Sequence, residues 1–195
     1  KRSCRSIAIS FPGVVDTISG KIIRSPINKD LENFSISDVL KNNINCPIGI
    51  ESHINNALIG ENWQGIAQNV KNLIYVELQD IFSASLLIEN QIVRGVNQLA
   101  GELDIADETK QMQHLGGKRL EVIIQKIASA ALLLDTALIV IDTNQSQSKN
   151  IISLLNKVLK AKGKEIPILE PKLKQQSITI GSLKMALTLS FENTN

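Results

Sequence analysis

The stretch at residues 72–95, NLIYVELQDIFSASLLIENQIVRG, constrains the fold more than any other part of the chain. It holds three strand-like runs, separated by LQD and by Glu89-Asn90. Short β-rich runs bounded by turn residues are typical of neighbouring strands joined by tight connections. The sequence therefore predicts a hairpin ladder in the middle of the chain.

Strands and helices alternate on both sides of this ladder. Strands are predicted at 6–11, 46–51, 137–142 and 166–170, and a hairpin at 14–26 turns at Ser19-Gly20. Helices are predicted at 35–43 with Ser35 as its cap, at 53–65 with Ala57, Leu58 and Trp63 inward, at 118–135, at 149–163, and from Gly181 onward. Strands interleaved with helices indicate an α/β architecture, with hairpins in the first half.

Composition argues against nucleic-acid binding by this part of the protein. Aliphatic residues dominate the apolar set, and there are only one Trp, one Tyr and four Phe, which leaves little for base stacking. The net charge of +2 comes from 21 basic and 19 acidic residues, and the lysines are mostly scattered. Such a balance is not the basic footprint of a nucleic-acid binder.

The two cysteines and the hydropathy indicate a cytoplasmic protein. Cys4 and Cys46 lie far apart with no C-x-x-C spacing, so the sequence predicts neither a disulfide framework nor a zinc knuckle. No apolar run reaches the roughly 18 to 20 residues of a membrane span, so no membrane partner is expected. Because the chain starts abruptly with KRSC before a core-like strand, we expect it to be a piece of a longer protein.

The order of three segments carries a family resemblance. IAISFPGVVDTISGKIIRSP, PIGIESHINNALIGENWQG and NLIYVELQDIFSASLLIENQIVRGVNQLAGELD together resemble the ROK family of repressors, open reading frames and sugar kinases. The resemblance implies the actin-like ATPase (ribonuclease H-like) fold of the two-lobed sugar kinases, incomplete in this chain. It implies a first lobe at 1–95 without its N-terminal phosphate hairpin, and a second lobe at 96–195 with a dimerisation surface. Residues 114–118 would mark either a deletion or a missing segment.

The resemblance also exposes a departure at the catalytic base. Kinases of the family carry Glu-Asn-Asp-Ala-Asn at the start of the second helix, and the Asp takes the proton from the sugar hydroxyl. The corresponding residues are Glu51, Ser52, His53, Ile54 and Asn55. His53 thus stands at the position of the base; an imidazole could accept a proton, but it is longer than Asp.

The residues expected to bind the nucleotide also differ from those of the family's kinases. The family's Gly-Thr-Gly turn lets backbone N–H groups approach ATP phosphates, which glycine allows at close range. Gln79, Asp80 and Ile81 stand there instead, and Asp142-Thr143-Asn144 replaces a later glycine run. We therefore expect no nucleotide cofactor, no catalytic residue and no kinase activity.

A sugar site is expected to survive in part. Glu102 in AGELD and Glu51 keep positions that the family uses for sugar hydroxyls, and Ser52, His53 and Asn55 are further candidates. The alternative is that both glutamates only close local backbone hydrogen bonds, that Asn55 only supports the helix start, and that His53 is packed. The family's zinc ligands are missing, since its His is Ile105 and no Cys run follows; His114 alone cannot hold zinc, so no metal is expected.

These residues lead to one expected function and two alternatives. The chain is expected to be the sugar-binding and dimerising portion of a ROK sugar-responsive transcriptional regulator similar to xylose repressors. It would be a homodimer, and it would reach DNA only through a winged helix-turn-helix outside this chain. The alternatives are an atypical sugar kinase with His53 as base, and a scaffold that binds neither sugar nor ATP.

Overall fold

The structure is a computed structural model that describes residues 4–79, 82–103 and 117–192. The predictions made for Asp80, Ile81, Ile105 and His114 lie outside the described residues. Most of the interval 114–118, where a deletion or a missing segment is expected, also lies outside them. None of the helices in the described part is both long and apolar enough to cross a membrane.

A five-stranded sheet with the order β7-β6-β5-β8-β9 forms the larger part of the molecule. β5 (Leu73–Leu78), β6 (Phe82–Ile88) and β7 (Gln91–Ile92) are antiparallel neighbours, which confirms the predicted ladder. β8 (Leu138–Thr143) pairs with β5 in parallel, and β9 (Ile168–Leu169) pairs with β8 in parallel. The sheet is therefore mixed, and the expected α/β class is confirmed.

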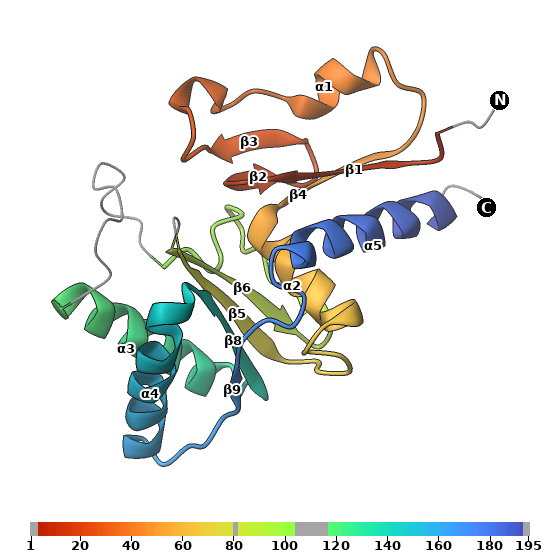
Figure 1. The fold of residues 1–195 in the computed structure, drawn as a ribbon. Helices are drawn as coiled ribbons and strands as arrows, with labels where there is room; N and C mark the ends of the chain where they lie inside the picture. The colour runs from red at the N-terminus through yellow and green to blue at the C-terminus, as the bar shows by residue number, and fades with distance from the viewer. Residues whose placement is uncertain (1–3, 80–81, 104–116, 193–195) are drawn as a thin grey trace.

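Helices cover both faces of this sheet. Alternate residues of β5 point to opposite faces, and apolar side chains are packed on each face. Ile74 and Val76 pack with Ile127 of α3 (Gly117–Leu133) and Leu155 of α4 (Gln145–Ala161) on one face. Tyr75 packs with residues of α2 (His53–Gln64) on the other face. Figure 1 shows α3 and α4 on one side of the sheet and α2 and α5 on the other.

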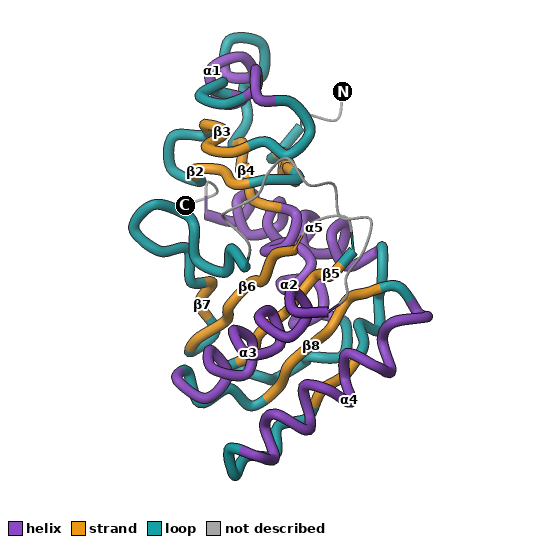
Figure 2. The backbone as a smooth tube through the Cα atoms, turned by 90° about the vertical axis from the view of Figure 1, so that its left-hand side faces the viewer, coloured by secondary structure: helices purple, strands orange, loops and turns teal. Residues whose placement is uncertain are grey.

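The first part of the chain forms a smaller unit above the large sheet in Figures 1 and 2. β1 (Ile7–Phe11) pairs in parallel with β4 (Ile48–Ser52), and β2 (Val14–Asp16) and β3 (Lys21–Arg24) form the predicted hairpin. A 3-10 turn, η1 (Lys29–Leu31), precedes α1 (Ile36–Lys41), where the Ser35 hydroxyl accepts from the Asp38 amide as expected of a cap. Buried Val15, Ile22 and Ile50 form the core of this unit.

The last helix, α5 (Gln176–Glu192), begins five residues before the predicted start at Gly181. Gly181 does not begin a helix but permits a close crossing: a Cβ there would lie 1.9 Å from the Asn56 carbonyl oxygen of α2. A Cβ on Gly60 of α2 would likewise lie 2.0 Å from the Ser177 carbonyl oxygen. The glycine that looked like a start signal is thus needed for packing, so the predicted boundary was wrong.

α5 also reaches the smaller unit. The Ser6 hydroxyl donates to the Ala186 carbonyl at 2.7 Å, and Met185 and Leu189 lie over Gly49 of β4. Trp63, expected to point inward, is only partly buried and lies under the Lys184 ammonium, 5.4 Å from its ring centre. α5, near the end of the chain, thus packs against β4 and α2 and contacts the segment before β1.

The large sheet joins strands from both sides of residue 95. Its strands β5 to β7 come from before that residue, and β8 and β9 come from after it. The reason is that β8 returns through a long connection to pair in parallel beside β5. The smaller unit, by contrast, draws its strands from residues 7–52 alone.

Candidate functional site

The candidate site begins where β4 passes directly into α2. β4 ends at Ser52 and α2 starts at His53, with no loop between them. The Ser52 hydroxyl accepts a long hydrogen bond from the Asn55 amide at 3.4 Å, which is the bond of a helix N-cap. Glu51, Ser52 and Asn55 are therefore fixed relative to one another by the strand and the first helical turn.

Glu51 is the most enclosed carboxylate of the site, with a side chain only 3% exposed. Its Oε1 accepts hydrogen bonds from the Ser52 amide at 2.9 Å and from Asn55 Nδ2 at 2.8 Å. Its Oε2 accepts from Arg94 Nη2 at 2.6 Å and Nε at 3.1 Å. The Ser85 hydroxyl donates to Asn55 Oδ1 at 2.6 Å, so the network continues into β6. Every oxygen of this buried carboxylate has a donor, as burial of a charge requires.

Glu102, in the segment that follows β7, is the second carboxylate of the site. Arg24 Nη1 at the end of β3 lies 2.9 Å from Glu102 Oε2, and Glu102 forms a backbone bridge with Ser83 of β6. Burial raises the pKa of Glu102 above its ordinary value, and electrostatic interactions with Arg24 and then His53 oppose that rise.

These side chains enclose one small cavity between the smaller unit and β6. The polar side chains that line it are those of Glu51, Ser52, Asn55, Arg94, Gln98 and Glu102, beside apolar residues such as Val14, Val15 and Ala84. Its volume is about 20 Å³, which is room for roughly one water molecule. Four of the five predicted sugar-site residues are thus brought together, in an arrangement too closed for a sugar.

His53, the fifth predicted residue, does not line this cavity. Its Nε2 lies 2.7 Å from Glu77 Oε2 on β5, and both side chains are largely buried. Its Nδ1 is buried and has no hydrogen-bond partner in the described part of the chain. The imidazole is therefore held by a carboxylate beside the cavity rather than in its wall.

Gln79 and Asp142, which the resemblance assigns to the nucleotide side, meet at the ends of β5 and β8. Gln79 Nε2 donates to Asp142 Oδ1 at 2.7 Å, and the Tyr75 hydroxyl donates to Asp142 Oδ2 at 2.8 Å. Burial raises the pKa of Asp142, the hydrogen bond from Tyr75 opposes the rise, and the charge of Glu77 adds to it. Two side chains that are expected to replace glycines, 63 positions apart in the sequence, are thus hydrogen-bonded to each other.

Sequence reasoning missed the basic partners of the site. Arg94 lies in the third segment of the resemblance and Arg24 in the first hairpin, but neither was singled out, and nor was Glu77. The pairing of an arginine with a carboxylate 43 positions away has no local sequence signal. Among the described residues, no group of three or more His, Cys, Asp or Glu side chains could hold a metal ion.

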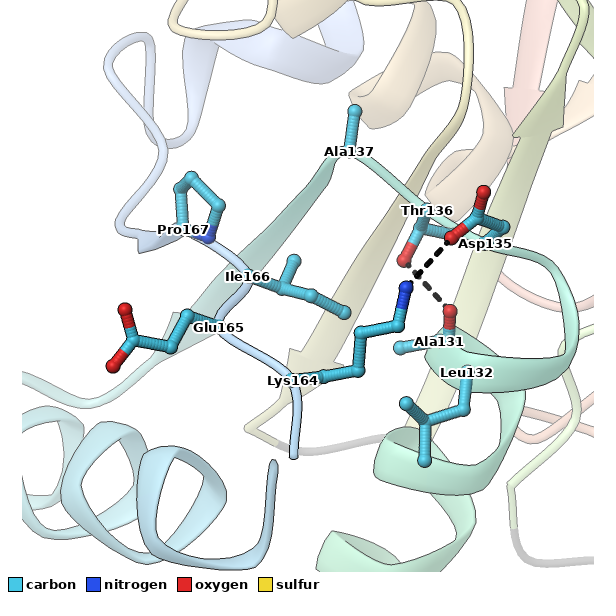
Figure 3. A pocket seen from close by; sticks show the side chains of 9 residues that line it. All are labelled: Ala131, Leu132, Asp135, Thr136, Ala137, Lys164, Glu165, Ile166 and Pro167. Atoms are coloured by element: carbon cyan, nitrogen blue, oxygen red, sulfur yellow. Dashed lines mark hydrogen bonds and ion pairs between the residues drawn. The ribbon is translucent and has the colours of Figure 1, made fainter. Parts of the chain in front are cut away.

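A larger cavity of about 190 Å³ lies elsewhere, at the end of α3 and the start of β8. Figure 3 shows Lys164 and Asp135 at its rim, with Lys164 Nζ 3.3 Å from Asp135 Oδ1. Both side chains are more than half exposed, so water screens the pair. It contains none of the predicted site residues.

Known proteins match about half of the chain. A protein from Klebsiella pneumoniae named Beta-glucoside kinase is 30% identical over 100 residues, which is 51% of this chain and 34% of that protein. A Xylose repressor from Caldicellulosiruptor bescii is 30% identical over 97 residues, which is 50% of this chain and 24% of that protein. The matched part thus spans only 34% and 24% of these relatives, and sequence likeness alone does not separate kinase from repressor.

Solved structures resemble nearly the whole chain. A ROK Hexokinase from Thermus thermophilus superposes with a TM-score of 0.72 at 17% identity, covering 97% of this chain and 80% of its own. A ROK family transcriptional regulator, described as a homolog of the E. coli MLC protein, gives 0.74 at 15% identity, covering 95% and 63%. These likenesses confirm the expected actin-like fold.

The family itself follows from a match to more than half of the sequence. The sequence model of the ROK family matches residues 1–104 of the 195-residue chain. This interval contains Glu51, Ser52, Asn55, Arg94 and Glu102, which line the small cavity. The chain belongs to the ROK family.

Proposed function

We propose that this chain is the sugar-binding and dimerising portion of a cytoplasmic, sugar-responsive transcriptional regulator without kinase activity. The observation that carries the proposal is the convergence of Glu51, Ser52, Asn55 and Glu102 on one cavity. Carboxylates and an amide set among apolar side chains suit a ligand with many hydroxyl groups, because each can accept or donate hydrogen bonds in a defined direction. DNA would be read by a winged helix-turn-helix outside this chain, and the regulator would be a homodimer.

Two ion pairs supply the conformational response that a regulator needs. Arg24–Glu102 and Arg94–Glu51 both join the smaller unit to the segment 94–102 that follows the ladder. A sugar can enter only if these contacts rearrange, because the closed cavity holds roughly one water molecule. Sugar hydroxyls would then replace the lost hydrogen bonds and favour the open arrangement. A ligand with different affinities for two arrangements shifts their populations, and distant DNA-binding modules could respond to that shift.

The contacts at the nucleotide side support the absence of phosphoryl transfer. The side chains of Gln79 and Asp142 are hydrogen-bonded to each other where the resemblance leads us to expect exposed glycine backbone, and Glu77 adds a second carboxylate nearby. Negative charge repels phosphate oxygens, and a nest of N–H groups that could attract them needs close backbone approach. Both features weaken ATP binding.

One observation favours the atypical sugar kinase as a second candidate. His53 Nε2 is held by Glu77 at 2.7 Å, and a histidine oriented by a carboxylate is a common form of general base. In that mechanism the imidazole would take a proton from a sugar hydroxyl while ATP donates its phosphoryl group. The kinase therefore requires ATP binding, which the regulator does not.

A thermal-shift titration of the full-length protein separates the candidates. The probes are D-xylose, D-glucose, N-acetylglucosamine and glucose 6-phosphate, each with and without ATP and Mg²⁺. The regulator predicts a higher melting temperature with one sugar and no change with ATP, since a ligand stabilises the state it binds. Glu102→Gln should abolish the sugar response, and Glu165→Gln, the same change at a largely exposed carboxylate, should leave it intact.

Each contrary result points to a different class of protein. Stabilisation by ATP, together with ADP release that depends on sugar and is lost in His53→Ala, would reject the regulator and support the kinase. No response to any sugar or to ATP would replace it by the scaffold.

A further inference from the structure

Cys4 and Cys46 are 42 positions apart in the sequence, yet their Sγ atoms lie 3.2 Å apart, and both are free thiols. The parallel pairing of β1 with β4 brings them together. The first residue pair of the two strands is Ile7 with Ile48, and the Ile7 amide donates to the Pro47 carbonyl at 2.8 Å. Each cysteine therefore stands just before one of two paired strands.

This geometry suits a covalent bond between the two sulfurs. Neighbouring strands lie about 4.8 Å apart, and disulfides join Cα atoms about 4.4 to 6.8 Å apart. Bond formation needs an approach of only about 1 Å from the present separation, which side-chain rotation can provide. Cys4 is exposed and Cys46 is partly exposed, so a small oxidant can reach the pair.

We propose that Cys4 and Cys46 form a thiol oxidation site that closes reversibly into an intramolecular disulfide under hydrogen peroxide. The Cys4 thiolate attacks one peroxide oxygen and becomes a sulfenic acid, while the other oxygen leaves as hydroxide and takes up a proton. The Cys46 sulfur then attacks the sulfenic sulfur, and a second water molecule leaves with the oxygen. Two thiols lose two electrons and two protons in total, and one peroxide becomes two waters.

The hydrogen bond between the thiols supports this order of attack. The Cys46 S–H donates to the Cys4 sulfur, and this bond raises the pKa of Cys46 above its ordinary value. Cys46 therefore keeps its proton, while the exposed Cys4 meets the oxidant first. Intracellular disulfides of this kind are usually transient, which fits a reversible site better than a permanent cross-link.

The cross-link would restrain a defined part of the molecule. It closes a loop that contains β1, the β2–β3 hairpin and α1, and it fixes the start of β4, whose other end carries Glu51 and Ser52. Because a disulfide removes freedom from the unfolded chain, the oxidised protein should melt about 5 to 10 °C higher than the reduced protein.

The test is titration of the full chain with hydrogen peroxide at low protein concentration. Free thiols are counted with a chromogenic disulfide, and peptide mapping without reductant identifies the bond. Both thiols should disappear together, with the elution volume in gel filtration unchanged, the melting temperature raised, and every change reversed by dithiothreitol. Cys4→Ser and Cys46→Ser should show no peroxide-dependent rise in melting temperature.

Three results would overturn the proposal. The first is survival of both thiols at a peroxide dose that oxidises the remaining thiol of either single variant. The second is a disulfide found only between two copies of the chain. The third is a Cys4–Cys46 bond that leaves the melting temperature unchanged, which would remove the proposed restraint.

Discussion

The contact between Arg94 and Glu51 offers a quantitative test of how the cavity is held closed. Replacement of Arg94 by Met keeps much of the side-chain volume and removes both donors to Glu51 Oε2, at 2.6 and 3.1 Å. Oε1 keeps its hydrogen bonds from Ser52 and Asn55. The variant therefore leaves one buried carboxylate oxygen without a partner.

The expected cost follows from burial on each side of the pair. Breaking a fully buried ion pair costs about 3 to 5 kcal/mol, and a hydrogen bond to a charged group contributes about 1.5 to 3 kcal/mol. The Glu51 side chain is 3% exposed but Arg94 is 36% exposed, so water can reach the space that Arg94 leaves. Arg94→Met should therefore lower the free energy of unfolding by about 2 to 3 kcal/mol, at the low end of the buried range.

Urea unfolding at pH 7 measures this cost and tests whether it comes from the unpaired charge. The proteins compared are wild type, Arg94→Met, Glu51→Gln and the double variant. The double variant should be more stable than the sum of the single losses predicts, by about 1.5 kcal/mol, because the unpaired charge is gone. Lys160→Met is the control, since it breaks the exposed Lys160–Glu165 pair and should cost less than about 0.5 kcal/mol. Additive losses, or an Arg94→Met loss no larger than that of Lys160→Met, would refute the assignment of a buried charge pair.

Three further changes test other contacts by the same unfolding assay. Gly181→Ala should cost about 3 kcal/mol, because its Cβ would meet the Asn56 carbonyl oxygen and the two helices would have to separate; a loss below about 1 kcal/mol contradicts this. Glu61→Gln should cost about 1 to 3 kcal/mol, because this fully buried carboxylate accepts the Leu173 amide at 2.7 Å among other backbone donors; a neutral result contradicts it. Asp142→Asn should be at least as stable as wild type at pH 7. Burial raises the pKa of Asp142, so the native state binds its proton more readily than the unfolded state, and wild-type stability falls as pH rises above 3.8. The advantage of the variant should vanish as pH falls toward that value, and an advantage that grows in acid would contradict the sign.

Local patterns predicted most of the elements, because each element carries its own signals. The Ser35 cap, the hairpin at 14–26 and the ladder at 72–95 depend on residues close in sequence, and the structure has all three. Gly181 misled the prediction, since a glycine can mark a helix boundary or allow two helices to touch, and only the packing of α2 on α5 decides between the two. The parallel partner of β5 was equally invisible, because no local residue marks which strand returns beside it.

The candidate site was predictable where it follows the family's motifs and not where it depends on long-range pairing. Glu51, Ser52, Asn55 and Glu102 stand at motif positions, and the structure places them around one cavity. The contact of His53 with Glu77 depends on α2 lying against β5, which the sequence does not specify residue by residue. The same holds for the two arginines, whose carboxylate partners lie 43 and 78 positions away.

The position of α5 has a consequence for the protein during its synthesis. β4 ends at Ser52 and α5 begins at Gln176, yet α5 covers β1 and β4 through Ser6, Gly49 and their contacts. At roughly 5 to 20 residues per second, a ribosome releases α5 about 6 to 25 s after β4. During that interval β1 and β4 of the nascent chain present an uncovered apolar face. Chaperones at the ribosome exit should therefore bind the growing chain until α5 emerges.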